Sequence, residues 1–201
     1  MKEILTLSIL FASLLSFCQG DFIIIKKDTV KCTITTIERK SGSIVKIGYI
    51  DMTNHEEVIL GKENCNSVTS LLIGKITFDY VPVFSGGLKT TRKAHMRKLI
   101  NGAVKVYGYD LFTVNTSKDG KREITAIGSD IVIDTKTVQL GKDGQFYNAS
   151  SKRVNEEIIF PYLNKCSTFA DNYPFKMKMN YLTTAFSLYN GYKCGSYSKV
   201  N

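Results

Sequence analysis

The residues best suited to chemistry in this chain are its five cysteines and two histidines, and their spacing limits what they can do. No pair of cysteines has the C-x-x-C spacing of a zinc or redox site, and His55 and His95 lie far apart in sequence. Neither histidine is followed at helical i+4 spacing by a second His, a Cys or a carboxylate. The sequence therefore predicts no metal site.

Motifs for covalent catalysis and nucleotide binding are also missing from the sequence. A Ser or Cys nucleophile needs a base and an orienting group, and there is no G-x-S-x-G turn or glycine-rich phosphate loop. Cys166, His95 and an Asp could form a catalytic set only if the fold brought them together. The sequence also does not exclude a pair of glycosidase carboxylates, because such partners can lie far apart in sequence. We expect a non-enzymatic protein that works by binding or scaffolding in the cell envelope or the extracellular space, without a cofactor. The alternative is a small hydrolase whose site forms only in three dimensions.

Residues 1–20 have the pattern of a secretory signal peptide. Ile4 to Phe17 is an uncharged apolar run of 14 residues, shorter than the roughly 20 residues needed to span a bilayer. Cys18 and Gly20 are small residues at −3 and −1 of a cut before Asp21. The alternative is a lipoprotein acylated on Cys18, although a large residue precedes it. The signal-peptide and lipoprotein hypotheses both predict export, to the periplasm or the medium. Neither hypothesis leaves a transmembrane segment in the mature chain.

Four cysteines remain after removal of the leader, and in an exported chain they suggest disulfides with three possible pairings. Cys166 and Cys194 are 28 residues apart and flank one predicted helix, so this pair is favoured. Cys32 and Cys65 lie in the same N-terminal β segment and form a weaker candidate pair. Buried free thiols are the alternative, above all for Cys32, which sits on an alternating apolar face.

Hydropathy patterns predict an α+β fold: a small N-terminal β barrel or sheet, an antiparallel β-meander, and two C-terminal helices packed on the sheet. Alternating apolar residues predict the β module over 21–84, and a basic linker follows at 85–98. The region 99–201 holds the meander and the helical pair. Three dipeptides predict the hairpin turns of the meander: Asn101-Gly102, Asp119-Gly120 and Asp143-Gly144. Whether this makes one domain or two stays open.

Helical signals begin after residue 150. Ser151 is a candidate cap for a first helix that Pro161 ends or bends. Pro174 suits the start of a second helix and Gly191 its stop. Apolar residues follow one another at spacings of 4, 3, 4 and 3, which predicts a stripe covering a sheet face, or a partner-binding face as the alternative: Phe175, Met179, Leu182, Phe186 and Tyr189.

A basic segment is the one local anomaly in a chain of net charge +9. Five cations fall within ten residues: Lys89, Arg92, Lys93, Arg97 and Lys98. They are candidates for binding an anionic lipid or polysaccharide surface. No aromatic residues alternate with them to stack bases, which makes nucleic acid an unlikely partner. The alternative is a solvated loop, since charge runs usually form exposed surface.

Several short motifs resemble those of a broad group of uncharacterised exported proteins common in Bacteroidetes-type Gram-negative bacteria. They are the leader end at 17–21, Lys27 to Cys32, Lys98 to Gly102 leading to Val106-Tyr107, Phe146-Tyr147, and Tyr189 to Cys194. Lys165-Cys166-Ser167 departs from the group, which tends to carry an acidic residue before this Cys and a Pro after it. The resemblance implies export and a layout of strands followed by helices. It implies no catalytic residue.

Overall fold

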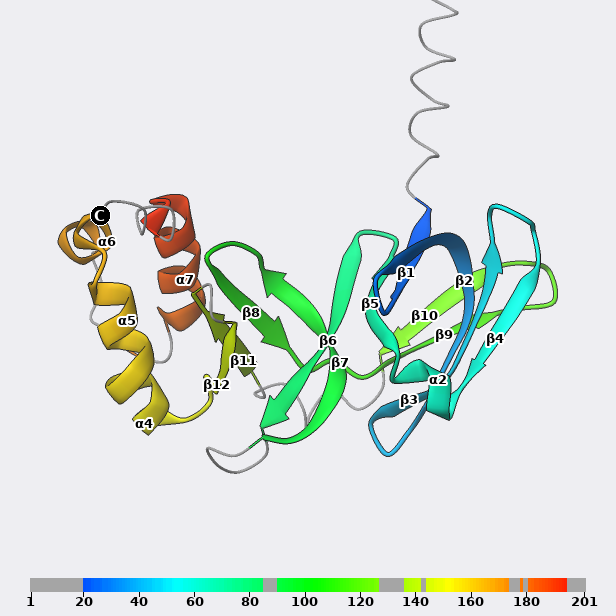
Figure 1. Ribbon diagram of the computed structural model, residues 1–201, viewed down its shortest axis with the longest axis horizontal. Coiled ribbons are helices and arrows are strands. Elements are labelled where there is room, and N and C mark those ends of the chain that lie inside the picture. The colour runs from blue at the N-terminus through cyan, green and yellow to red at the C-terminus, as the bar shows by residue number, and fades with distance from the viewer. Residues whose placement is uncertain are drawn as a thin grey trace, which may run out of the picture. The chain divides into compact units, whose positions relative to one another are not determined.

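The computed structural model of the 201-residue chain describes residues 20–84, 90–126, 136–141, 144–173, 178 and 181–194. The fold is mostly antiparallel β-sheet, with most of its helical residues in the C-terminal part (Figure 1). Two compact units are present. The described residues of the first unit fall within 1–77 and 113–125, and those of the second fall within 78–112 and 126–201. The predicted combination of antiparallel sheet with C-terminal helices is confirmed at this coarse level.

The first unit is an open sheet rather than a closed barrel. Its strands are ordered β10-β9-β2-β1-β5, with β3 on β2 and β4 on β3. The barrel alternative is wrong because, among the described strands, β4 and β10 each pair on one side only, so the sheet is open. The elements are β1 (Asp21–Ile25), β2 (Asp28–Lys40), β3 (Ser43–Asp51), β4 (Glu57–Gly61), α2 (Lys62–Cys65), β5 (Val68–Ile73), β9 (Phe112–Thr116) and β10 (Arg122–Ala126).

Alternating side chains build the core of the first unit, as the period-2 pattern predicts. The fully buried members come from several strands: Ile23, Cys32, Ile34, Ile37, Ile47, Val68, Leu71 and Val114. Strand β2 is long enough to pair with β1 through its first half and with β3 through its second half. A register shift between Ile34 and Thr36 lies within the part of β2 that pairs with β3.

The second unit contains a sheet ordered β6-β7-β8-β11-β12. Its strands are β6 (Ile76–Phe84), β7 (Thr90–Ile100), β8 (Val104–Gly108), β11 (Lys136–Leu140) and β12 (Gln145–Asn148). The linker expected over 85–98 is therefore wrong from Thr90 onward, and residues 85–89 lie outside the described part of the chain. Ala94 and Met96 are buried on one face of β7. Long cationic side chains are compatible with such a strand because their aliphatic stems can cover apolar surface.

The meander expected over 99–149 is not continuous. Strand β8 pairs with β7 and β11, whereas β9 and β10 belong to the first unit, where β9 pairs with β2. The Thr116 hydroxyl also donates a hydrogen bond to the Thr35 carbonyl oxygen at 2.9 Å. Two of the three predicted glycines do adopt positive φ in their turns, at Gly120 (80°) and Gly144 (67°). The apolar run from Ile131 to Ile133 also predicts a strand of this meander, and it lies outside the described residues.

The helical region begins as predicted and then departs from prediction. The Val154 amide donates to the Ser151 hydroxyl at 3.4 Å, which confirms the cap. The helix continues past Pro161 because a π-helical turn precedes it, and proline, which lacks an N–H, is tolerated at the start of a helical segment. The helices are α4 (Lys152–Val154), the π-helix η1 (Asn155–Ile159), α5 (Phe160–Asn164), α6 (Ser167–Asn172) and α7 (Leu182–Gly191). No helix among these described residues is long and apolar enough to cross a membrane.

The helices pack on one face of the second sheet. Val104, Val106, Val138 and Leu140 supply the sheet side of this core. The helices contribute Ile159, Leu163, Phe169, Leu182, Phe186 and Tyr189. The last three confirm the described part of the predicted stripe, while Pro174, Phe175 and Met179 lie outside the described residues.

Gly102 provides space for a side chain rather than a left-handed turn. Its φ is not positive, contrary to the prediction for Asn101-Gly102. The Asn190 amide on α7 donates to the Val104 carbonyl at 2.8 Å and accepts from the Val104 amide at 3.0 Å. A Cβ at position 102 would lie 2.5 Å from Asn190 Cγ.

We expect Gly102→Ala to lower the free energy of unfolding by about 2 kcal/mol, because it displaces the Asn190 amide and breaks both hydrogen bonds. Asn190→Ala should cost a similar amount. The double variant should cost clearly less than the sum, since Asn190→Ala removes the group with which Ala at 102 would collide. Urea denaturation of the four proteins measures this coupling, and strict additivity would contradict it.

Candidate functional site

The predicted basic segment lies along strand β7, and two of its cations are engaged in ion pairs. Arg97 Nε is 2.7 Å from Asp110 Oδ2, and Lys98 Nζ is 2.7 Å from Asp79 Oδ2. The second pair is the more enclosed, with side-chain exposures of 22% and 17%. Sequence reasoning missed both partners because the acids come from β6 and from the residues after β8. Lys89 lies outside the described residues.

The remaining cations do not form one patch with these pairs. Successive side chains of a strand point to opposite faces, so Arg92 and Lys98 share one face of β7, and Lys93 and Arg97 share the other. Arg92 is exposed, but its guanidinium lies 5.3 Å from the Tyr109 ring centroid and donates to the Tyr109 hydroxyl at 3.0 Å. Lys93 is exposed. Binding of an anionic surface by this segment stays a prediction, with the charge divided between two faces.

A buried tyrosine also binds the Asp79 carboxylate that pairs with Lys98. The Tyr107 hydroxyl donates to Asp79 Oδ2 at 3.1 Å, and the side chain is almost fully buried. Burial raises the pKa of Tyr107 above its ordinary value, and the neighbouring Asp79 charge adds to the effect. Tyr107 therefore remains a hydrogen-bond donor at neutral pH. The arrangement joins β6, β7 and β8.

Asp21 is a polar centre that the sequence analysis did not single out. Its side chain is 3% exposed and forms an ion pair with Arg122 of β10. Its two oxygens also accept hydrogen bonds from the backbone amides of Ile34 and Gly74, both at 2.9 Å. One carboxylate thus connects β1 with β2, with the turn after β5, and with β10. The only sequence signal was its position directly after the predicted cut.

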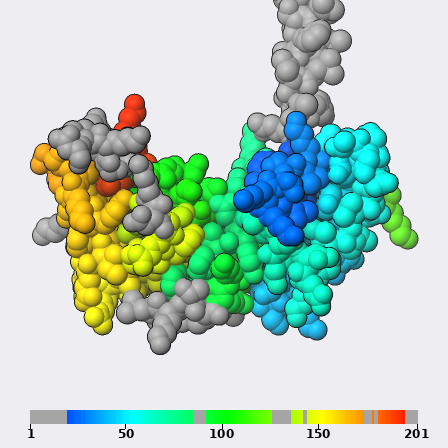
Figure 2. Space-filling model, viewed as in Figure 1, coloured from blue at the N-terminus to red at the C-terminus, as the bar shows by residue number. Residues whose placement is uncertain are grey.

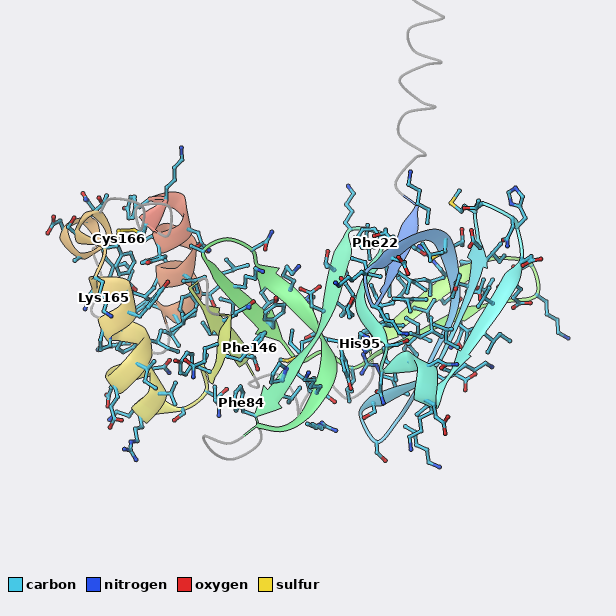
Figure 3. All side chains as sticks on the ribbon, in the orientation of Figure 1. Phe22, Phe84, His95, Phe146, Lys165 and Cys166 are labelled. Atoms are coloured by element: carbon cyan, nitrogen blue, oxygen red, sulfur yellow. A yellow bond between two sulfur atoms is a disulfide. The ribbon has the colours of Figure 1, made fainter. Side chains whose placement is uncertain are left out.

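The two histidines lie in different units and different environments. His55 is exposed in the turn between β3 and β4, with a left-handed φ of 61°. His95 is buried on β7, with its ring centroid 4.9 Å from that of Tyr80 (Figure 3). Within the described ranges, no three or more His, Cys, Asp or Glu side chains gather in a way that could hold a metal ion.

The cysteines divide into one disulfide and two buried thiols. Cys166 and Cys194 are bonded, as predicted, with their Cα atoms 5.6 Å apart (Figure 3 shows Cys166 between α5 and α6). Cys166 is therefore not a free nucleophile, and the arrangement drawn with His95 is wrong. Cys32 and Cys65 are buried and unbonded, so the weaker pairing is also wrong and the free-thiol alternative is right. They lie on β2 and at the end of α2, each packed into the core by its own element.

Burial suppresses the reactivity of both thiols. It raises the pKa of Cys32 to about 12, with smaller contributions from the Asp21 and Asp51 charges, and it also raises the pKa of Cys65. We expect iodoacetamide at pH 8 to leave both unmodified in the folded chain, because the thiolate is the reacting species. Unfolding without reductant should expose two reactive thiols in the mature chain, and reduction should add two more. Rapid labelling of the folded chain, read by mass, would contradict this.

Comparison with family models, with curated proteins and with solved structures finds no match to this chain. The resemblance to exported proteins therefore stays a prediction. Functional inference depends on the residues and contacts described above.

Proposed function

We propose that this chain is an exported, non-enzymatic protein that works by binding or scaffolding in the cell envelope or outside the cell. The observation that carries the proposal is the Cys166–Cys194 disulfide, which fastens the end of α7 to the junction of α5 and α6. Structural disulfides persist in oxidising compartments and are rare in the cytosol. The disulfide therefore supports the reading of residues 1–20 as an export signal.

The start of the first strand supports the same proposal. Gly20 is exposed, whereas Asp21 is buried and begins β1. The contacts of Asp21 with Ile34, Gly74 and Arg122 are made by its side chain, so a cut before Asp21 leaves them in place.

The binding part of the proposal is supported by exposed apolar side chains on the strand pair β3–β4 and in the turn that joins the two strands. Ile50, Met52 and Ile59 are 38%, 53% and 59% exposed. Exposed apolar residues that lie near one another on a protein surface are typical of interaction sites. The polar groups Asp21, Asp79 and Asn190, in contrast, are engaged in contacts that hold elements together.

Export is tested by fusing residues 1–21 to a phosphatase reporter that becomes active only after forming its own disulfides. We expect strong reporter activity in intact cells. Replacing Leu7 and Leu10 with Arg should reduce it at least about tenfold, because charge interrupts the apolar run. Glu3→Arg changes charge outside that run and should preserve activity. Equal activity with the apolar run intact or interrupted would contradict export by this segment.

A further inference from the structure

Strand β4 ends the first unit's sheet on one side. Among the described strands it pairs only with β3, and α2 follows at its C-terminal end (Figure 1). The edge runs over five residues, Glu57–Gly61. Backbone N–H and C=O groups on a strand edge are available for pairing with a strand from another chain.

An apolar side chain stands at the centre of this edge. Ile59 is the third of the five residues and is 59% exposed. The register pairs Gly48 with Ile59 and Ile50 with Glu57, so Ile50 and Ile59 share one face. In Figure 2, β4 belongs to the part of the first unit that is drawn in cyan. A second strand laid along β4 would cover the most exposed of its apolar side chains.

The residues on the two sides of β4 carry opposite charges. Two copies of β4 related by a two-fold rotation would therefore bring opposite charges together. Antiparallel pairing of β4 with a second β4, centred on Ile59, places Glu57 opposite Gly61. It also brings Glu56, which directly precedes the strand, toward Lys62 of the second copy, the first residue of α2. Glu56 and Lys62 are both exposed, and Asn54 Nδ2 donates to Glu56 Oε2 at 2.9 Å, which orients the carboxylate. Because the interface is symmetric, the Glu–Lys match occurs twice.

The other edge of the same sheet lacks this match. Strand β10 also carries a central exposed isoleucine, Ile124, at 50%. Pairing β10 with itself around Ile124 places Arg122 opposite Ala126, and Arg122 is already paired with Asp21 in its own chain. Exposure alone does not distinguish the two edges, but charge does.

We propose that the chain forms a two-fold dimer by antiparallel pairing of β4 with β4 of a second copy. This deepens the proposed binding function by naming one partner, and it rests on that function. An edge of five residues buries little area, so we expect a reversible dimer that forms as the concentration rises.

Sedimentation equilibrium over about a hundredfold range of protein concentration tests the dimer. The sample is the mature chain purified from an oxidising compartment. We expect Ile59→Lys to raise the dissociation constant at least about tenfold, because two like charges would meet at the symmetry axis. Ile124→Lys is the matched control and should leave it within about twofold. Protection of the Cys32 and Cys65 thiols in each variant shows that the fold is intact.

A charge exchange tests the register. Glu56→Lys and Lys62→Glu should each weaken the dimer, and the double exchange should restore it, because both cross-chain pairs are then re-formed with reversed sign. A monomer throughout the concentration range, equal effects of the two isoleucine substitutions, or failure of the double exchange to restore the dimer would each overturn the proposal. None of these results bears on the reporter test of export, so the two proposals fail separately.

Discussion

Asp21→Ala is expected to lower the free energy of unfolding of the first unit by about 3–5 kcal/mol, because it leaves the partly buried Arg122 guanidinium without its counter-ion. It also removes the acceptor for the Ile34 and Gly74 amides. That loss is a large share of the roughly 5–15 kcal/mol that stabilises a typical domain. Urea denaturation followed by circular dichroism measures the shift.

Glu38→Gln provides the matched control, because Glu38 forms an ion pair with Lys46 on the surface of the same unit. Exposed pairs contribute about 0–1 kcal/mol, so this variant should unfold close to the wild-type midpoint. Asp21→Ala with Arg122→Met should recover part of the loss, because the unpaired charge is then removed as well. Similar small effects of Asp21→Ala and Glu38→Gln would contradict a central role for Asp21.

Replacing Cys166 and Cys194 with Ser is the second change with a large expected effect. A disulfide closing a loop of this length, with a sequence separation of 28, is expected to stabilise by about 3.5 kcal/mol through restriction of the unfolded chain. The second unit should therefore unfold at a clearly lower urea concentration. Reduction of the wild-type chain should produce the same loss.

The double serine variant also supplies the control for reduction. A reductant should not change its unfolding, because Cys32 and Cys65 are already free thiols. The variant and the reduced wild-type chain could instead both unfold at the same urea midpoint as the oxidised wild-type chain. The disulfide would then not stabilise the fold, and it would no longer support export.

Local features of this fold were predictable from the sequence. The Ser151 cap and the Gly120 and Gly144 turns depend on neighbouring residues, and the structure has all of them. The Cys166–Cys194 pair was also accessible, because two cysteines flanked a single predicted helix. In each case the interaction that decides the geometry is close in sequence or limited to few candidates.

Strand partners were not predictable in the same way. The alternation in β9 shows which residues are buried, but it does not specify that Val114 pairs with Ile37, which lies 114 − 37 = 77 residues earlier in the sequence. The sequence did not predict strand β7 for a different reason. Its cations suggested a solvated linker, and the acids that pair with Arg97 and Lys98 come from other parts of the second unit.

The candidate site likewise has parts that the sequence predicts and parts that it does not. Composition located the basic segment, but pairing with Asp79 and Asp110 could be seen only in three dimensions. Asp21 illustrates the limit most clearly, because its partners at positions 34, 74 and 122 share no sequence motif with it.

We propose that the chain works as a processed, disulfide-bonded protein outside the cytosol. Intact mass and N-terminal sequencing of the chain isolated from the cells that make it distinguish this state from an unprocessed, reduced one. We expect an N-terminus at Asp21, one disulfide, and two thiols that react only after unfolding. A chain recovered from the cytosol with Met1 in place and every cysteine reduced would contradict it.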